Sequence, residues 1–160
     1  MSDQGPRENR FKFARPIKVA FRDIDGMRHV NHAVYLTYCE TARNEYWMKV
    51  CELQDVSEFD FVLAEVTARY HAPAKLGDEL LVGVRITELR RSSFLCEAEI
   101  SNVVTGQLVC EVNSVQVMYD YATGKSVAIS DKRRHQIEAF EGKSLTSAPK
   151  KLVRTRSKGA

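Results

Sequence analysis

The sequence predicts an α+β fold in which an antiparallel sheet of five strands wraps over one long helix. In this chain of 160 residues, apolar side chains recur at helical spacing through residues 33–50, and the period changes to two after residue 60. One strand, one long helix and then four strands in succession is the order of a single α+β layer domain. No glycine-rich phosphate-binding motif follows a strand, so dinucleotide-binding and P-loop folds are excluded.

The first strand is predicted from Ile17 to Phe21, and the helix from Ala33 to Val50. The apolar stripe of this helix is broad, which indicates a helix largely enclosed by the rest of the domain. The stripe consists of Tyr35, Leu36, Tyr38, Cys39, Ala42, Tyr46, Trp47 and Val50. Polar residues that begin at Gln54 end the helical pattern.

Segments in which apolar and polar residues alternate are predicted to be strands, over residues 61–71, 80–86, 94–100 and 108–119. Gly106 marks a hairpin turn before the last strand. Within that strand the apolar phase shifts between Val112 and Val115, which predicts a β-bulge. A short helix is predicted from Ser130, a suitable N-cap, to Phe140.

Composition favours one globular domain in the cytoplasm. The chain is 44% hydrophobic and 28% charged. No apolar run approaches the roughly 20 residues of a membrane span, and the first residues do not resemble a signal peptide. We expect a flexible segment over residues 1–14, the domain over 15–141 and a basic, disordered tail over 142–160.

The net charge of +3 comes from that tail, which carries six basic residues and no acidic one. The rest of the chain has 18 basic against 21 acidic residues, or −3. The body therefore gives no sign of a nucleic-acid surface. A basic tail can touch nucleic acid or anionic lipid, but a solvated tail is the favoured interpretation.

The four cysteines lie far apart, without a Cys-x-x-Cys pair. In an intracellular chain this spacing argues against a zinc site and against a disulfide framework. We expect them to be small buried core residues and not nucleophiles: Cys39, Cys51, Cys96 and Cys110.

The densest polar cluster lies between the first strand and the long helix. Two carboxylates, two histidines and an asparagine fall within ten residues: Asp23, Asp25, His29, Asn31 and His32. The N-terminus of a helix offers unpaired N–H groups and a partial positive charge. Such donors stabilise a developing oxyanion, while a nearby carboxylate serves as base or nucleophile.

Each member of the cluster also has a structural interpretation. Asp25 can cap a turn or pair with Arg22 or Arg28, and Asp23 is favoured as a structural partner. Asn31 suits an N-cap as well as it suits the orientation of water. A metal site built from Asp25 and the two histidines is disfavoured.

These residues resemble a known family. Asp23-Ile-Asp25, His29-Val-Asn31-His32 and Tyr35-Leu-x-Tyr38-x-Glu40-x-Ala42-Arg43 are similar to the signature of hotdog-fold acyl-CoA thioesterases, in particular the 4-hydroxybenzoyl-CoA thioesterase-like family. Further similar segments begin at Tyr70 and Arg90, and the resemblance covers about residues 15 to 140. It implies a single hotdog fold, a long central helix wrapped by the sheet.

The resemblance also implies a mechanism. Asp25 would act as nucleophile or as general base for water, with the backbone N–H at about His32 as oxyanion donor. Asn31 and the His32 side chain are expected to orient water or the thioester, and no cofactor or metal is required. Glu40 is the reserve carboxylate, and its alternative is a salt bridge with Arg43.

Family sites lie between subunits, so the resemblance implies a homodimer or homotetramer with active sites at the subunit interface. Ser92 or Ser93 would then reach Asp25 of the partner chain. The candidates for substrate binding are the residues that suit CoA phosphates, the thioester edge or an acyl pocket: His29, Tyr35, Lys75, Arg90, Arg91, Ser92 and Ser93.

The function implied is hydrolysis of an acyl-CoA thioester to a free acid and CoA. The His-Val-Asn variant of the motif tilts the expected substrate towards medium-chain or long-chain fatty acyl groups over aromatic ones. Acyl carrier protein can replace CoA as the carrier. The alternative from another class is a non-catalytic acyl-CoA-binding or regulatory hotdog protein, and a hotdog dehydratase is disfavoured because its Asp and His spacing is missing.

Overall fold

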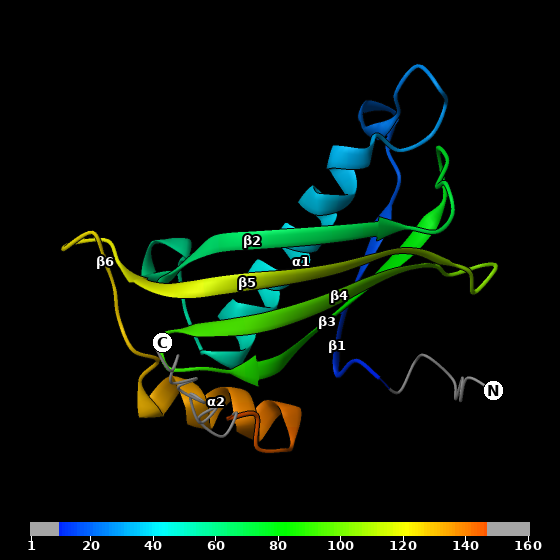
Figure 1. Cartoon of the computed structure of the whole chain (residues 1–160). Helices are drawn as coiled ribbons and strands as arrows, with labels where there is room; N and C mark the ends of the chain where they lie inside the picture. The colour runs from blue at the N-terminus through cyan, green and yellow to red at the C-terminus, as the bar shows by residue number, and fades with distance from the viewer. Residues whose placement is uncertain (1–9, 147–160) are drawn as a thin grey trace, which may run out of the picture.

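A computed structural model describes residues 10–146, and its centre is one antiparallel sheet (Figure 1). The strands lie in the order β1-β3-β4-β5-β2, and a short β6 pairs with β5. All the pairs are antiparallel. The strands are β1 (Phe13–Lys18), β2 (Phe61–Tyr70), β3 (Glu79–Leu89), β4 (Ser93–Asn102), β5 (Leu108–Asp120) and β6 (Lys125–Ser126).

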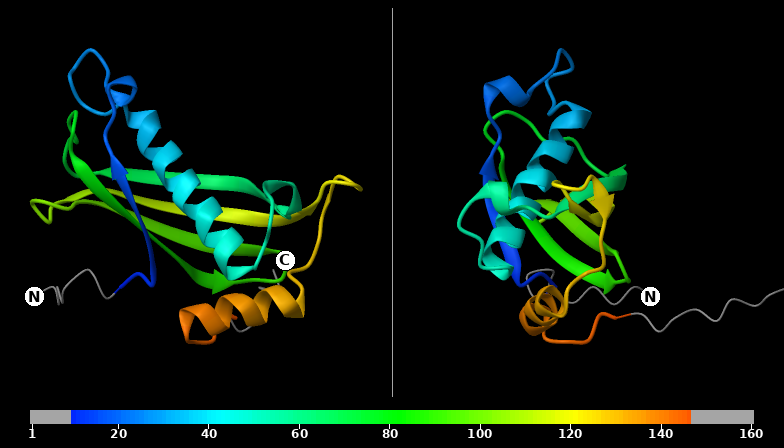
Figure 2. Two further views of the ribbon diagram at one scale, coloured as in Figure 1. Left: turned by 180° about the vertical axis from the view of Figure 1, so that it is seen from behind. Right: turned by 90° about the vertical axis from the view of Figure 1, so that its left-hand side faces the viewer.

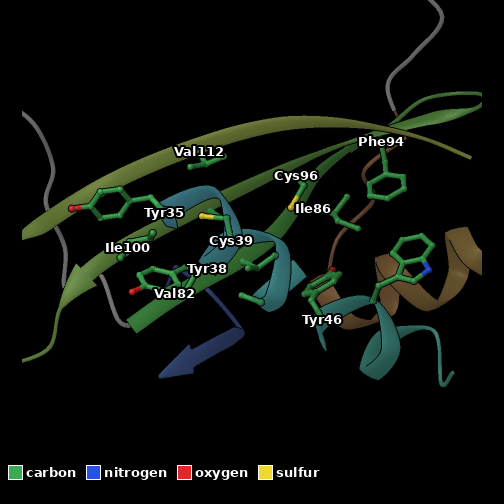
Figure 3. Close-up of a cluster of buried hydrophobic side chains, with 14 of the residues drawn as sticks. Tyr35, Tyr38, Cys39, Tyr46, Val82, Ile86, Phe94, Cys96, Ile100 and Val112 are labelled. Atoms are coloured by element: carbon green, nitrogen blue, oxygen red, sulfur yellow. The ribbon is translucent and has the colours of Figure 1, made fainter. Parts of the chain in front are cut away.

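Helix α1 (His32–Val50) lies across one face of the sheet, as Figure 2 shows from two sides. Its broad apolar stripe packs on the inward residues of β3, β4 and β5, and Figure 3 shows part of this core. Trp47 stacks on Phe94 with 4.8 Å between ring centroids, and Phe61 packs edge-on against both rings. The structure thus confirms the predicted α+β fold and its enclosed helix.

Helix α2 (Asp131–Glu141) closes the end of the sheet near the C-terminus of α1. Ser130 caps it, since its hydroxyl accepts a hydrogen bond from the Arg133 N–H, as predicted. The Tyr46 hydroxyl donates to the Glu141 carboxylate over 2.6 Å, which ties α1 to α2. Among the described residues, no helix is long and apolar enough to span a membrane.

The beginning of the chain differs from the prediction. The first strand runs from Phe13 to Lys18, and Phe21–Asp23 form a 3₁₀ turn that starts the loop before α1. Phe13 and Ala14 therefore belong to β1. At the other end, Leu145 is buried, so packing continues beyond residue 141. The remaining parts of the expected terminal segments, 1–9 and 147–160, lie outside the described residues.

The predicted bulge between Val112 and Val115 was wrong. Strand β5 keeps its register with β4 through this stretch, from Ala98 opposite Val112 to Phe94 opposite Gln116. The irregularities lie elsewhere, between Leu63 and Glu65 of β2, in β3 and near the start of β5. The apolar pattern shifts because Ser114 and Gln116, both polar, take buried positions on the face towards α1.

Candidate active site

The loop between β1 and α1 folds back on itself, and Asp25 lies next to the bridge that joins its two arms. Ile24 and Val30 form an isolated antiparallel bridge, and the Asp25 N–H donates to the His29 carbonyl over 3.0 Å. One carboxylate oxygen of Asp25 accepts from the Met27 N–H at 2.9 Å. The loop closes through Arg28, whose φ of 64° is left-handed. Asp25 remains partly exposed, and no hydrogen bond within residues 10–146 uses its second oxygen.

Asp23, two residues earlier, is held by the fold. Its Oδ2 accepts from the Ala20 N–H at 2.9 Å and from the Tyr38 hydroxyl at 2.7 Å. Burial raises the pKa of Tyr38, and the hydrogen bond to Asp23 raises it further, so the phenol stays a donor. Arg22 lies 4.0 Å from Asp23, and among the described residues no ion pair involves Asp25. The two carboxylates therefore differ in availability.

The first turn of α1 leaves one backbone donor free. The Asn31 side chain accepts from the Ala33 N–H at 3.0 Å, which confirms the predicted N-cap, and its carbonyl accepts from the Val34 N–H. No hydrogen bond within residues 10–146 uses the His32 N–H. The His32 carbonyl accepts from the Tyr70 hydroxyl at 2.9 Å, which anchors the start of the helix to β2. A fixed N–H with the helix dipole behind it suits an oxyanion.

Two aromatic residues and the turn after β2 pack beside this loop. The Tyr35 hydroxyl accepts from the Ala74 N–H at 3.0 Å, and the Tyr35 ring lies 5.5 Å from the ring of Tyr70. Burial is the main cause that raises the pKa of Tyr35. Since Tyr35 is 3% exposed, it supports the loop instead of lining an open surface. The Ala74 carbonyl accepts from the Val30 N–H, which places the exposed Lys75 next to the loop.

The other predicted CoA-binding residues lie at the opposite end of the sheet within the protomer. Arg90, Arg91 and Ser92 form the turn between β3 and β4, and Ser93 begins β4. The loop of Asp25 adjoins the start of β3, because Lys18 pairs with Glu79. Eleven residues of strand separate the two ends, or about 30 Å. Within one chain the structure therefore does not bring Arg90–Ser93 to Asp25.

A hollow of about 350 Å³ lies near the Asp25 end, between the turn after β2 and the β4–β5 hairpin. Its lining includes the carboxylates Asp78 and Glu79 together with Asn102. Two carboxylates repel an anion, so this hollow does not suit the phosphates of CoA.

Glu40 and Arg43 do not form the salt bridge considered as an alternative for Glu40. Among the described residues no ion pair joins them, because Arg43 is buried and Glu40 exposed. Within residues 10–146 no group of three or more histidine, cysteine or acidic residues is arranged for a metal ion. All four cysteines are free and buried, as expected, and burial raises the pKa of Cys110 to about 11.

Known proteins with similar sequences are thioesterases by name. Residues 19–137 match the model of a family described as the thioesterase-like superfamily. Acyl-CoA thioesterase YbgC of Helicobacter pylori is 39% identical over 74 residues, which are 46% of this chain and 56% of that relative; the chain thus spans about half the length of such a relative. Long-chain acyl-CoA thioesterase FadM of Escherichia coli K12 is 28% identical over 76% of this chain and 94% of its own length. The 1,4-dihydroxy-2-naphthoyl-CoA hydrolase of Synechocystis is 30% identical over 67% of this chain and 79% of its own length.

A solved structure supports the same relationship. The thioesterase of Thermus thermophilus, complexed with coenzyme A and zinc, superposes with a TM-score of 0.76 at 34% identity. The similarity covers 84% of this chain and 98% of that one.

Proposed function

Because the chain belongs to the thioesterase-like superfamily, we propose that it is an acyl-CoA thioesterase whose chemistry is centred on Asp25 and the His32 N–H. The single observation that carries this proposal is the start of α1. A partly exposed carboxylate and an unused backbone donor lie on one short loop, whereas the neighbouring Asp23 is occupied by two hydrogen bonds. The names of the relatives support the same activity.

Hydrolysis needs a new carbon–oxygen bond and the loss of a thiolate. The Asp25 carboxylate either removes a proton from water as the water attacks the thioester carbonyl, or attacks that carbonyl itself. In both routes the carbonyl oxygen becomes negative and accepts a hydrogen bond from the His32 N–H. The C–S bond then breaks, and CoA leaves as thiolate and takes up a proton. In the general-base route this step yields the free acid, whereas in the nucleophilic route it leaves a mixed anhydride on Asp25, which a water molecule then hydrolyses to release the acid. Thiolate is a good leaving group, so no Ser-His-Asp relay is needed.

The site is completed, in this proposal, by a second copy of the chain. Strand β2 is at the edge of the sheet, and its open edge offers a row of unpaired backbone groups. When the β2 edges of two copies pair antiparallel about a two-fold axis, the C-terminal end of one β2 lies beside the N-terminal end of the other. The Arg90–Ser93 turn lies at the same end of the sheet as the beginning of β2, since the Met118 N–H of β5 donates to the Ser92 carbonyl and Met118 lies opposite Phe61.

In such a dimer the partner's turn would lie at the same end as Asp25. Arg91 is exposed and free to meet a phosphate of CoA, while Arg90 pairs with Glu88 at 2.9 Å. Lys75, beside the loop of the first copy, would meet the same substrate from the other side. The dimer therefore accounts for candidate residues that a single protomer keeps about 30 Å apart.

We propose that the substrates are medium-chain and long-chain acyl-CoAs and that the protein acts in the cytoplasm. The E. coli relative is named for long-chain acyl-CoA, whereas the Synechocystis relative is named for an aromatic acyl-CoA, so both classes belong in the test. Free, buried cysteines agree with a reducing compartment.

The test is thiol release from matched acyl-CoAs: short, medium and long aliphatic ones and an aromatic one. The proposal expects equal amounts of CoA and free acid from at least one of them. Acyl-CoA that binds without any release of thiol would instead make the chain a binding protein. Release from acyl carrier protein thioesters, and not from acyl-CoA, would keep the chemistry and change the carrier.

A further inference from the structure

Arg43, on the inner side of α1, is a charged residue without a hydrogen-bond acceptor or an anion among the described residues. It is 9% exposed, and its Nε is buried with no acceptor. Its guanidinium carbon lies 5.8 Å from the centre of the Phe61 ring. Among the described residues, Arg43 makes no hydrogen bond and no ion pair.

Gln116 lies on the face of β5 towards α1 and is also incompletely paired. It is fully buried, and its Oε1 has no donor. Its Nε2 donates to the Ser114 hydroxyl at 2.7 Å, and that hydroxyl lies 3.5 Å from the Cys96 carbonyl. The apolar core around these residues would accommodate leucine or methionine at both positions, yet the chain carries polar groups there.

A buried Nε without an acceptor, on a cation that has no anion beside it, is costly. Arginine cannot lose its proton in a protein, so the charge of Arg43 persists. An unpaired buried charge or polar atom destabilises the fold unless an acceptor arrives from elsewhere. Arg43 and Gln116 therefore indicate a binding site for an anionic group.

The position of Arg43 relates this site to the start of α1. Arg43 follows His32 by eleven residues, which is close to three helical turns. The two residues thus lie on nearly the same side of α1, about 16 Å apart along its axis. Arg43 stands where the far end of an acyl chain would lie if the thioester were at the His32 N–H.

The inner face of β2 supplies an apolar surface between these two points. Leu63, Val66 and Tyr70 lie opposite Gln116, Ser114 and Cys110 of β5, whose side chains face α1. The three β2 side chains are nevertheless 46%, 39% and 47% exposed. Helix α1 does not cover them, so a chain of methylene groups can lie against them.

We propose that Arg43, assisted by Gln116, binds a carboxylate at the far end of the acyl chain, so that the preferred substrates are CoA monothioesters of dicarboxylic acids. The guanidinium donates two parallel hydrogen bonds to a carboxylate. Because the Ser114 hydroxyl can donate as well as accept, the Gln116 amide can turn its NH₂ group to the same carboxylate. This inference rests on the proposed function and specifies the substrate of the same site.

The experiment compares acyl-CoAs of equal length that end in a methyl, a hydroxyl or a carboxylate, across short, medium and long chains. The readout is kcat/KM from thiol release by the wild-type dimer. We expect the carboxylate-ended ester of one length to exceed its methyl-ended match by about ten- to a hundredfold, the range of a charge-assisted hydrogen bond. In Arg43→Met this ratio should fall to about one or below, while Arg43→Lys keeps part of it.

Lys49→Met is the matched control, since it removes a cation from the exposed side of the same helix and should leave the ratio unchanged. Thermal unfolding shows whether each variant folds. If Arg43→Met does not fold, the wild-type ratio of kcat/KM between carboxylate-ended and methyl-ended esters still decides the question. Thiol release with no preference, or with a preference for the methyl end, overturns the inference and leaves the proposed function intact. The absence of thiol release from every ester contradicts the proposed function itself.

Discussion

The two ends of the sheet carry polar groups of opposite character. At the end where β1 leads into α1, the Asp25 carboxylate has one hydrogen bond and the His32 N–H has none among the described residues. At the other end, several polar side chains are hydrogen-bonded within the protein. Asp60 accepts from Trp47 at 3.1 Å and from Arg133 at 3.0 Å, and Arg134 donates to the carbonyl groups of Arg90 and Arg91.

The difference assigns different tasks to the two ends. Satisfied polar groups around an aromatic core stabilise a fold, whereas unused ones are kept where a ligand will meet them. Substitutions at the two ends should therefore separate stability from catalysis.

The largest expected effect is on stability, at the aromatic end. Trp47→Ala removes a buried ring from its stack with Phe94 and should lower the free energy of unfolding by about 3–5 kcal/mol. The kcat of the molecules that remain folded should change little, because the ring lies far from the loop of Asp25. Urea unfolding and kcat at low temperature are the measurements. A large loss of kcat with little loss of stability would contradict the assignment of stability to this end of the sheet and of catalysis to the other.

The next effect concerns the open edge of β2. Val66→Lys places a charge on a side chain that is 39% exposed in the protomer, so the protomer should still fold. A lysine on an edge strand opposes its pairing with a second copy, so we expect monomers and at least a tenfold loss of kcat/KM. Because Val66 also lies on the surface proposed for the acyl chain, the oligomeric state is the deciding readout. Light scattering and thiol release measure both. Val104→Lys, at a hairpin tip that is 81% exposed, is the control. An active monomer would show that one protomer holds the whole site.

A smaller effect is expected at the turn of the partner. Arg91→Ala removes an exposed cation, so KM for acyl-CoA should rise by about two- to fivefold, the range of an exposed ion pair, while kcat stays the same. The rise should shrink at high salt because exposed charges are screened. Lys132→Ala, on α2 at the same end, should leave KM unchanged, and an equal rise in that variant would contradict the role of the turn.

The smallest effect concerns the support of Asp23. Tyr38→Phe removes one hydrogen bond, which should cost about 1 kcal/mol of stability. Burial raises the pKa of Tyr38, so above pH 10.0 the unfolded chain ionises while the folded one holds its proton, and stability falls as pH rises. Urea unfolding at pH 8 and above pH 10 should show a shallower fall for Tyr38→Phe. An identical fall would mean that Tyr38 ionises in the folded state.

Periodicity predicted the elements of this fold because helix and strand spacings are local properties of a sequence. The helix over 33–50 is an example, since its enclosed stripe is visible without the sheet. The prediction failed at Ser114 and Gln116, where polar residues face the core and shift the apparent phase. A local conflict of this kind points to a binding task that periodicity does not encode.

The candidate site could be predicted in part. Two aspartates in one loop are visible in the sequence, but only the structure separates their roles through Ala20 and Tyr38. The Tyr70 hydroxyl on the His32 carbonyl was missed, because side chains of β2 and backbone of α1 meet only after folding. The distance between Asp25 and the Arg90–Ser93 turn likewise depends on strand direction and not on spacing along the chain.

The most direct test of the account measures kcat/KM and thermal stability for Asp25→Asn beside the matched variant Asp23→Asn. The account predicts at least a hundredfold loss of kcat/KM in Asp25→Asn, roughly 2.7 kcal/mol of transition-state stabilisation, with the dimer intact and an unchanged melting temperature. Asp23→Asn should lose stability and far less activity. Full activity in Asp25→Asn together with an inactive but stable Asp23→Asn would contradict the account and move the chemistry to the other carboxylate.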